Sequence, residues 1–182
     1  MRVFIAGSRR ITGLGSDILE RLDNILRNKY EILVGDANGV DRLVQVYASQ
    51  KNYHHIKVYC VNSECRNNVG NWEINAVAYN SRKKDFRYYA SKDEAMVRDA
   101  DYGFFIWDGK SKGTLKSVVG LVALQKHLLL YYQPSRQFHT LTSKESLSKF
   151  LVSIGLYDPE TGVALESESH NNPVDAQNSL RF

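Results

Sequence analysis

The sequence predicts an α/β fold, a three-layer sandwich in which helices cover both faces of a mostly parallel sheet. Two observations predict it. Short apolar runs alternate along the chain with segments that repeat apolar residues at helical spacing. Three of these apolar runs also end in loops that combine glycine with polar residues. Strands that alternate with helices form parallel sheets with right-handed crossovers, and 182 residues are enough for one such domain with a buried core.

The first part of the chain supplies three strands and two helices. The strands are expected at residues 2–6, 31–34 and 56–61. Residues 17–28 carry apolar side chains on one helical face, and Ser16 and Asp17 are suited to cap that helix. A second helix is expected to begin near Asp41, which stands where a cap residue belongs.

The second part begins with residues 62–87, which are polar apart from an apolar interlude and fit either a short helix or a flap over a ligand. Beyond them we expect a helix at 92–100, strands at 102–107, 128–132 and 138–141, and a helix at 114–127. A last helix starts at the capping-box pattern Thr142-Ser-Lys-Glu145 and ends at Gly155. We assign residues 1–155 to the domain and 156–182 to a polar tail, in which residues 163–165 are apolar enough to dock.

Composition narrows the class of partner. The net charge of +4 and the pI of about 9.0 suit a phosphate ligand, while the lack of a contiguous basic block makes nucleic acid an unlikely partner. No apolar run approaches the roughly 20 residues of a membrane span. The stretch Met1-Arg-Val-Phe-Ile5 has the pattern of a strand rather than of a secretory signal. We therefore expect a cytoplasmic protein with no membrane partner.

The three glycine-bearing loops are the candidate site. Because the carboxyl ends of parallel strands meet at one edge of a sheet, where ligands bind in open α/β folds, we expect these loops to form one ligand site. The candidate ligand-binding residues are Gly7, Ser8 and Arg9, then Gly35, Asp36, Gly39, Val40 and Asp41, and finally Asp108, Gly109, Lys110, Ser111, Gly113 and Thr114.

The third loop has the chemistry of a phosphate site. It lies between an apolar strand and a helix, and the first N–H groups and the dipole of a helix favour an anion. Gly113 and Thr114, with Lys110 and Ser111, would supply amides, hydroxyls and an ammonium group. The alternative is a glycine-rich turn with a threonine cap. Arg9 would contact a second phosphate or stack on a base, or it is a surface residue in a solvated turn.

The carboxylates allow two interpretations. Asp36 and Asp108 directly follow strands and would accept hydrogen bonds from ribose hydroxyls, whereas Asp41 is as well explained as a helix cap. A carboxylate beside an anomeric carbon would instead cleave an N-glycosidic bond, if an acid protonated the leaving base. This hydrolase or transferase alternative stays open, because spacing in the sequence cannot place the groups.

Together the three loops resemble the SLOG superfamily, and within it the stand-alone YspA/YpsA-like proteins. The resemblance rests on Gly7-Ser-Arg9, Gly35-Asp-Ala-Asn-Gly-Val-Asp41 and Asp108-Gly-Lys-Ser-Lys-Gly-Thr114, and it covers residues 1–155. It implies a Rossmann-like fold, a nucleotide or nucleotide-derived ligand, a sensor or accessory role, and assembly into dimers or larger oligomers. One branch, DNA processing protein A, binds single-stranded DNA, which is our third functional hypothesis.

Another related branch, the Lonely Guy phosphoribohydrolases, provides a test for enzymatic activity. Their motif Pro-Gly-Gly-x-Gly-Thr-x-x-Glu matches here at Gly113-Thr114, but the position of its glutamate is Ser117. The position of their catalytic arginine, aligned on Met96, is Lys92. The resemblance therefore implies ligand binding without the Lonely Guy reaction, and it identifies no catalytic residue.

Two further groups of residues have ordinary explanations. His54, His55, Cys60 and Cys65 do not have the spacing of a zinc site or of a disulfide framework, so we expect no metal and no cofactor. Trp72, Tyr79, Tyr88 and Tyr89 would form a stacking platform for bases or, as we prefer, belong to the core or to an interface.

Overall fold

The structure, a computed structural model, describes residues 1–80 and 83–157. In this part of the chain seven strands form one sheet in the order β4-β3-β2-β1-β5-β6-β7, and every pair of neighbours is parallel except β6 and β7. The elements are β1 (Arg2–Gly7), α1 (Ser16–Arg27), β2 (Glu31–Gly35), α2 (Val40–Gln50), β3 (Ile56–Val61), β4 (Glu73–Val77), α3 (Phe86–Asp99), β5 (Tyr102–Trp107), α4 (Lys112–Ala123), β6 (Leu128–Tyr132), β7 (Gln137–Leu141) and α5 (Lys144–Ser153).

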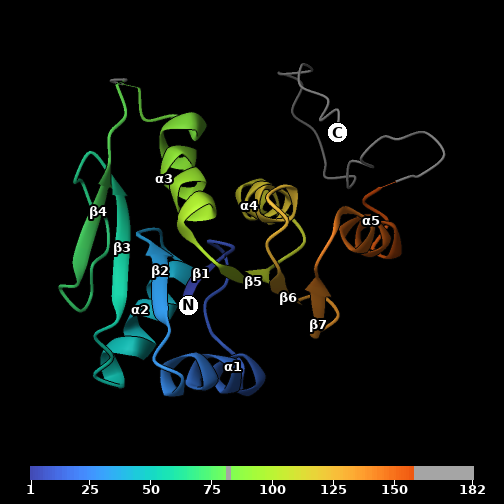
Figure 1. Ribbon diagram of the computed structural model, residues 1–182, viewed down its shortest axis with the longest axis horizontal. Helices are drawn as coiled ribbons and strands as arrows, with labels where there is room; N and C mark the ends of the chain where they lie inside the picture. The colour runs from blue at the N-terminus through green and yellow to red at the C-terminus, as the bar shows by residue number, and fades with distance from the viewer. Residues whose placement is uncertain (81–82, 158–182) are drawn as a thin grey trace.

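Helices cover both faces of the sheet: α1 and α2 lie on one side, and α3, α4 and α5 on the other (Figure 1). Alternate residues of β1 point into the two cores. Val3 and Ile5 pack with the cluster under α1 and α2, whereas Phe4 packs with the cluster under α3, α4 and α5. The predicted three-layer α/β sandwich with a mostly parallel sheet is confirmed.

The chain reverses its direction across the sheet between β1 and β5. It runs outward from β1 through β2 and β3 to β4, and then returns through α3 to place β5 beside β1. The loops after β1 and β5 therefore flank a topological switch point, the place where open α/β sheets leave a crevice for ligands.

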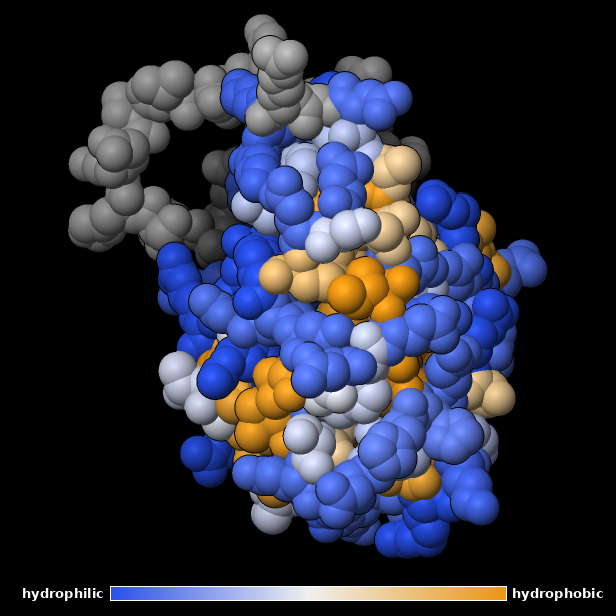
Figure 2. All heavy atoms as spheres, turned by 90° about the vertical axis from the view of Figure 1, so that its left-hand side faces the viewer, coloured by the Kyte–Doolittle hydropathy of each residue, from blue (hydrophilic) through white to orange (hydrophobic). Residues whose placement is uncertain are grey.

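Residues 62–87 are the main difference from the prediction. Their described residues contain β4, which pairs in parallel with β3 at the edge of the sheet, and the start of α3, but no separate short helix. Figure 2 views the molecule from the β4 side and shows a mostly hydrophilic face with scattered hydrophobic groups. The apolar interlude of this range corresponds to β4, whose residues are exposed or half-buried, so its pattern does not indicate a buried strand. Helix α3 also begins earlier than predicted, at Phe86, with Asp85 accepting a hydrogen bond from the Tyr88 amide.

Three predicted caps are wrong. The N-cap of α1 is Gly15 rather than Ser16 or Asp17, and no side chain caps this helix. The N-cap of α2 is Gly39, so Asp41 lies inside the first turn. The capping box of α5 is formed by Ser143 and Ser146 instead of the Thr142–Glu145 pair. In each case the helix begins a residue or more from the expected position.

The end of the described chain packs on the domain: Leu156 and Tyr157, which we assigned to the tail, contact the core cluster on the α5 side. The predicted docking piece at residues 163–165 lies outside the described residues. Within the described part, no helix has the length and apolarity needed to cross a membrane.

Candidate functional site

Ser8 joins the three predicted loops at the carboxyl edge of the sheet. Its hydroxyl donates a hydrogen bond to Asp108 Oδ1 over 2.7 Å, which links the loops after β1 and β5. Its carbonyl oxygen accepts a hydrogen bond from the Val40 amide over 3.5 Å, which links the loops after β1 and β2. The Ser8 side chain is fully buried, so this residue holds the loops together instead of facing a ligand directly.

The glycines of the first two loops are required by packing between the loops. A Cβ atom on Gly7 would collide with the Ile106 carbonyl oxygen and with Val40, and one on Gly39 would collide with Arg9 and Ser8. Gly39 also has a φ of 75°, which favours glycine. A Cβ on Gly35 would strike Asp41 and Lys92. These glycines therefore explain the close approach of the loops without reference to a ligand.

In the third loop, one protein carboxylate occupies amides that we assigned to a phosphate. Asp108 Oδ1 accepts hydrogen bonds from the amides of Lys110 and Ser111, each over 2.9 Å, in addition to the Ser8 hydroxyl. Burial opposes ionisation of Asp108, but these hydrogen bonds outweigh it and lower the pKa of the carboxyl group. The loop is thus preorganised around an anion that the protein itself supplies.

The start of α4 is still open to an external anion. Ser111 Oγ caps the helix by accepting hydrogen bonds from the amide and the hydroxyl of Thr114, which is buried. Between Ser111 and Thr114, the amides of Lys112 and Gly113 belong to the first turn of the helix, where N–H groups have no intrahelical acceptor. A Cβ on Gly113 would meet no atom within 4 Å, so the space beside it is open.

The loop after β2 contains a buried ion cluster. Asp36, with 2% of its surface exposed, accepts three hydrogen bonds from Arg66: two of 3.1 Å from its amide and Nε, and one of 2.6 Å from its terminal nitrogen. Burial opposes the ionisation of Asp36, but the hydrogen bonds from Arg66 outweigh it and lower its pKa. The carboxylate oxygens of Asp36, which we expected to accept hydrogen bonds from ribose hydroxyls, therefore already accept hydrogen bonds from Arg66.

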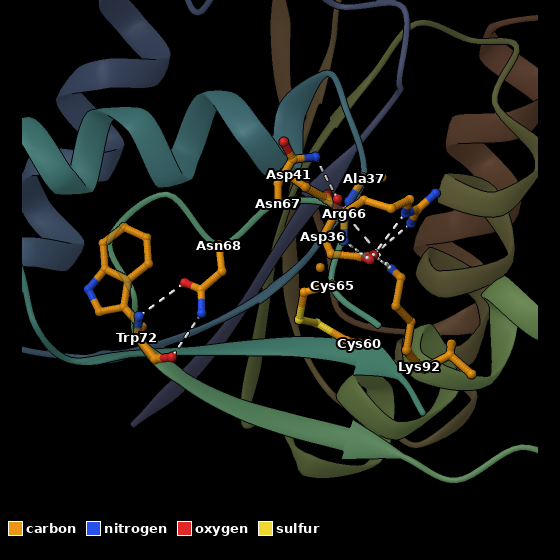
Figure 3. Close-up of a disulfide and its surroundings, with 12 residues drawn as sticks. Asp36, Ala37, Asp41, Cys60, Cys65, Arg66, Asn67, Asn68, Trp72 and Lys92 are labelled. Atoms are coloured by element: carbon orange, nitrogen blue, oxygen red, sulfur yellow. Dashed lines mark hydrogen bonds and ion pairs between the residues drawn. A yellow bond between two sulfur atoms is a disulfide. The ribbon is translucent and has the colours of Figure 1, made fainter. Parts of the chain in front are cut away.

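Lys92 lies in the same cluster (Figure 3). Its ammonium is 2.7 Å from Asp93, 3.8 Å from Asp36 and 4.0 Å from Asp41, and only 3% of the residue is exposed. Burial lowers the pKa of Lys92, but the three carboxylates outweigh this effect and raise it. The ammonium group is therefore charged and balances the buried carboxylates. Ser117, at the other position related to Lonely Guy catalysis, is buried and donates to the Gly113 carbonyl.

Asp41 differs from Asp36 in the direction in which its pKa is shifted. It accepts a hydrogen bond of 3.1 Å from the Ala37 amide, and it is fully enclosed. Burial raises its pKa to about 6, because the attraction of Lys92 only partly offsets the cost of a buried charge and Asp93 adds repulsion. Asp41 consequently titrates near pH 6, and its hydrogen bond and its ion pair are made with groups of the protein itself.

The segment that covers this cluster, residues 66–69, belongs to the range in which we expected a short helix or a flap, but none of its residues was predicted as a site residue. Asn67 donates to the Asp36 carbonyl oxygen over 2.7 Å and to the Asn38 side chain over 3.2 Å. The buried Gln45 donates to the carbonyl oxygens of Gly35 and Asn67, and it accepts from the Val69 amide. One signal was present: residues 62–68 are polar and directly follow β3, so the rule that we applied to the other three strand ends applies to them as well.

An aromatic ring with two guanidinium groups stands beside the loops. The Tyr89 ring centre is 5.5 Å from the Arg9 guanidinium and 4.4 Å from that of Arg66. A cavity of about 170 Å³ opens beside Arg66, Tyr88 and Tyr89. Tyr88 is buried, and its ring centre is 5.9 Å from the Lys84 ammonium. The buried Trp72 ring donates to the Tyr53 carbonyl oxygen, so Tyr89 is the residue of the proposed platform that meets both guanidinium groups.

The cysteines correct an expectation. Cys60 in β3 and Cys65 in the segment after it form a disulfide, although their spacing did not suggest a disulfide framework. Among residues 1–80 and 83–157, the structure contains no group of three or more histidine, cysteine, aspartate or glutamate side chains that could hold a metal ion.

No protein-family model matches the chain, and no curated protein matches it. Among solved structures, DNA processing protein A from Helicobacter pylori, studied for its single-stranded DNA binding mode, aligns with a TM-score of 0.54 and 18% identity. The alignment covers 71% of this chain and 64% of that protein, so the chain spans less than two thirds of its length. The structural genomics target TM1055 aligns with a TM-score of 0.50 and 19% identity over 90% of this chain and 89% of its own. Both likenesses show the Rossmann-like fold that the SLOG resemblance implies.

Proposed function

We propose that the protein binds a nucleotide or a nucleotide-derived phosphate ligand at the carboxyl edge of its sheet, as a sensor or accessory protein. The observation that carries the proposal is the contact of Tyr89 with the guanidinium groups of Arg9 and Arg66, next to the joined loops after β1, β2 and β5. A half-buried aromatic face suits a base, and guanidinium groups suit phosphate oxygens.

The phosphate is expected at the start of α4. The amides of Lys112 and Gly113 lie in the first turn of α4, where helical N–H groups have no intrahelical acceptor and the positive end of the helix dipole favours an anion. Lys110 in the loop and Lys112 at the first position of α4 are exposed and add two positive charges. The loop adjoins the switch point between β1 and β5, so a ligand would reach from this helix toward Arg9 and Tyr89.

The arrangement supports binding better than glycosidic cleavage. Cleavage needs a carboxylate that is free to act at the anomeric carbon. Asp36, Asp41 and Asp108 all accept hydrogen bonds from the protein, and the first two are buried. The sensor role is therefore our conclusion, and release of free base is the outcome that would replace it by the hydrolase alternative.

The test is calorimetry with a panel of nucleoside mono-, di- and triphosphates, accompanied by chromatography for free base. For any nucleotide that binds, Arg9→Ala and Tyr89→Leu should each weaken affinity about tenfold, the scale of a lost anchor contact. Arg27→Ala is the matched control. Arg27 is an exposed arginine in the last turn of α1, shortly before the amino end of β2 and thus away from the carboxyl edge of the sheet. Unchanged affinity of both site variants would contradict the proposal.

Single-stranded DNA is a second candidate ligand, favoured by one observation beyond the sequence. The chain shares its fold with DNA processing protein A, whose single-stranded DNA binding mode has been described. Arg9, Arg10, Lys110 and Lys112 are exposed cations on the loops after β1 and β5, although the sequence has no basic block. Fluorescence anisotropy with an oligothymidylate should then show affinity that falls steeply with salt, and no binding at about 50 mM salt would remove this candidate.

A further inference from the structure

The Cys60–Cys65 disulfide ties the covering segment to the sheet. Cys60 is a fully buried residue of β3, and Cys65 is half-buried in the segment that leaves that strand (Figure 3). Their Cα atoms are 5.1 Å apart, an ordinary separation for a disulfide. Of the two sulfur atoms, only that of Cys65 belongs to a residue with appreciable exposure, so an external thiol has one point of attack.

Two cationic side chains lie near Cys65. The residue lines the cavity of about 170 Å³ together with Arg66 and Lys84. Cations beside a cysteine stabilise its thiolate, the form that attacks disulfides and that leaves when a disulfide breaks. Both cations are themselves paired with carboxylates, Lys84 with Glu64 and Arg66 with Asp36.

The disulfide is directly connected to the candidate ligand site. Arg66 follows Cys65, donates three hydrogen bonds to Asp36 and contacts the Tyr89 ring. Asn67 and Val69, a few residues further on, are hydrogen-bonded to Asp36 and Gln45. The disulfide closes residues 60–65 into a short ring that starts on β3, and the residues that make these contacts follow that ring in the chain. Breaking it would release one end of the segment that holds Arg66 over the loop after β2.

We propose that Cys60 and Cys65 form a reversible thiol–disulfide site, reduced through Cys65 by a dithiol, and that its state controls whether Arg66 is held against Asp36 and Tyr89. The control of ligand affinity rests on the proposed function, whereas the redox site and its effect on Arg66 stand without it. The partner is defined by its chemistry, a small or protein dithiol that can reach Cys65.

The exchange balances with the dithiol as the reductant. One thiolate of the dithiol attacks Cys65 Sγ, the bond between Cys60 and Cys65 breaks, and the electron pair leaves on Cys60 Sγ, which takes up a proton. The second thiolate of the dithiol then attacks the first sulfur atom of the dithiol and releases the Cys65 thiolate. The products are a protein dithiol and an oxidised reductant, with two electrons transferred.

The first experiment needs no ligand. The native full-length protein is treated with dithiothreitol, alkylated with iodoacetamide and weighed, and hydrogen exchange is followed by mass spectrometry. Because the chain contains two cysteines, alkylation after complete reduction should add two carbamidomethyl groups. The amides of Arg66 and Val69, which are hydrogen-bonded in the oxidised structure, should then exchange at least about tenfold faster. The Cys60→Ala/Cys65→Ala double variant should show no response to dithiothreitol.

No alkylation of the folded protein after dithiothreitol would overturn the redox site. Alkylation without faster exchange in residues 62–69 would overturn its control of Arg66. Cys65→Ser provides an independent check, because it leaves Cys60 as a buried thiol and keeps Arg66. Without reductant, this variant should already exchange as fast as the reduced wild type. Protection as strong as in the oxidised wild type would show that the disulfide does not hold the segment.

The second experiment addresses the ligand site with a fluorescent ATP analogue as the probe. Its affinity for the wild type should change at least about fivefold on reduction, and affinity for the double variant should not respond. Equal affinity of the oxidised and reduced wild type would overturn control of binding while leaving the redox site in place. Failure of the probe to bind either form would count against the proposed function, and the exchange experiment would still decide on the redox site.

Discussion

At the carboxyl edge of the sheet, the loop after β5 is held by contacts within a few residues and by one serine of the loop after β1, whereas the loop after β2 is held by charged residues from distant segments. Asp108 bonds to the amides of Lys110 and Ser111, two and three positions away. Asp36 bonds instead to Arg66, thirty positions away, and lies near Lys92 of α3. The same edge of the sheet therefore combines a turn held by uncharged donors with a shared ion cluster.

The difference teaches which part can change independently. Removal of the carboxylate from the loop after β5 takes the acceptor from uncharged donors, two amides of the same turn and the Ser8 hydroxyl, and leaves no buried charge unpaired. The buried cluster behaves otherwise, because each of its charges is balanced by charges on other elements, and removal of one leaves the others unpaired in a medium that solvates them poorly. Four substitutions test this contrast.

The largest effect is expected from Lys92→Met. The substitution keeps the volume of the side chain but leaves the carboxylates of Asp36 and Asp41 without the buried ammonium group. We expect the free energy of unfolding to fall by about 3 kcal/mol in urea titrations near neutral pH. Lys116→Met is the control, because Lys116 forms an exposed pair with Glu94 and its loss should cost at most about 1 kcal/mol. Equal stability of the two variants would break the comparison.

A smaller effect is expected from Asp108→Ala. This change removes the acceptor for the Lys110 and Ser111 amides and for the Ser8 hydroxyl. The amides lie close to solvent, which partly replaces the lost acceptor, so we expect unfolding to become easier by about 1 to 2 kcal/mol. A loss of stability as large as that of Lys92→Met would contradict the difference between the loop after β5 and the ion cluster.

The smallest effect is a pH dependence, measured on Asp41→Asn. The folded-state pKa of Asp41, about 6, lies above its ordinary value of 3.8, so the folded protein retains a proton in this range that the unfolded chain has lost. The wild type consequently loses stability as pH rises from 3.8 to about 6, and it bears the full cost above that range. The variant does not titrate, so its stability relative to the wild type should be about 1 kcal/mol more favourable near pH 8 than near pH 5.

Asp36→Asn supplies the contrast in the same cluster. The pKa of Asp36 is lowered, so the stability it contributes is present above its ordinary pKa of 3.8 and is lost as pH falls below that value. The difference between this variant and the wild type should therefore stay constant over the range in which that of Asp41→Asn changes. A parallel change in both variants would show that the two carboxylates titrate as one unit.

Most of the fold could be predicted because its signals are local. The central strands are runs of buried apolar residues, such as Val3 to Ile5, and α1 repeats its apolar residues with helical spacing. The edge strand β4 could not be predicted, since its side chains are largely exposed and its pairing with β3 is made by the backbone. Helix starts were displaced because a cap depends on where the preceding loop ends.

The candidate site was predictable only in part. The rule that strand ends share an edge brought Ser8, Val40 and Asp108 together, and hydrogen bonds join their loops. The rule could not show that Asp108 would occupy the amides assigned to a phosphate, or that Arg66 would occupy Asp36. Both pairings are choices among acceptors that become available only after the loops are packed.

The sequence by itself determined the layers of this protein and the edge at which its loops gather, because apolar periodicity and glycine-bearing strand ends act over a few residues. Only the tertiary structure decided the disulfide, the clamp of Arg66 on Asp36 and the burial of Lys92. These depend on how segments far apart in the chain are positioned, and on the cost of leaving a buried charge without a partner.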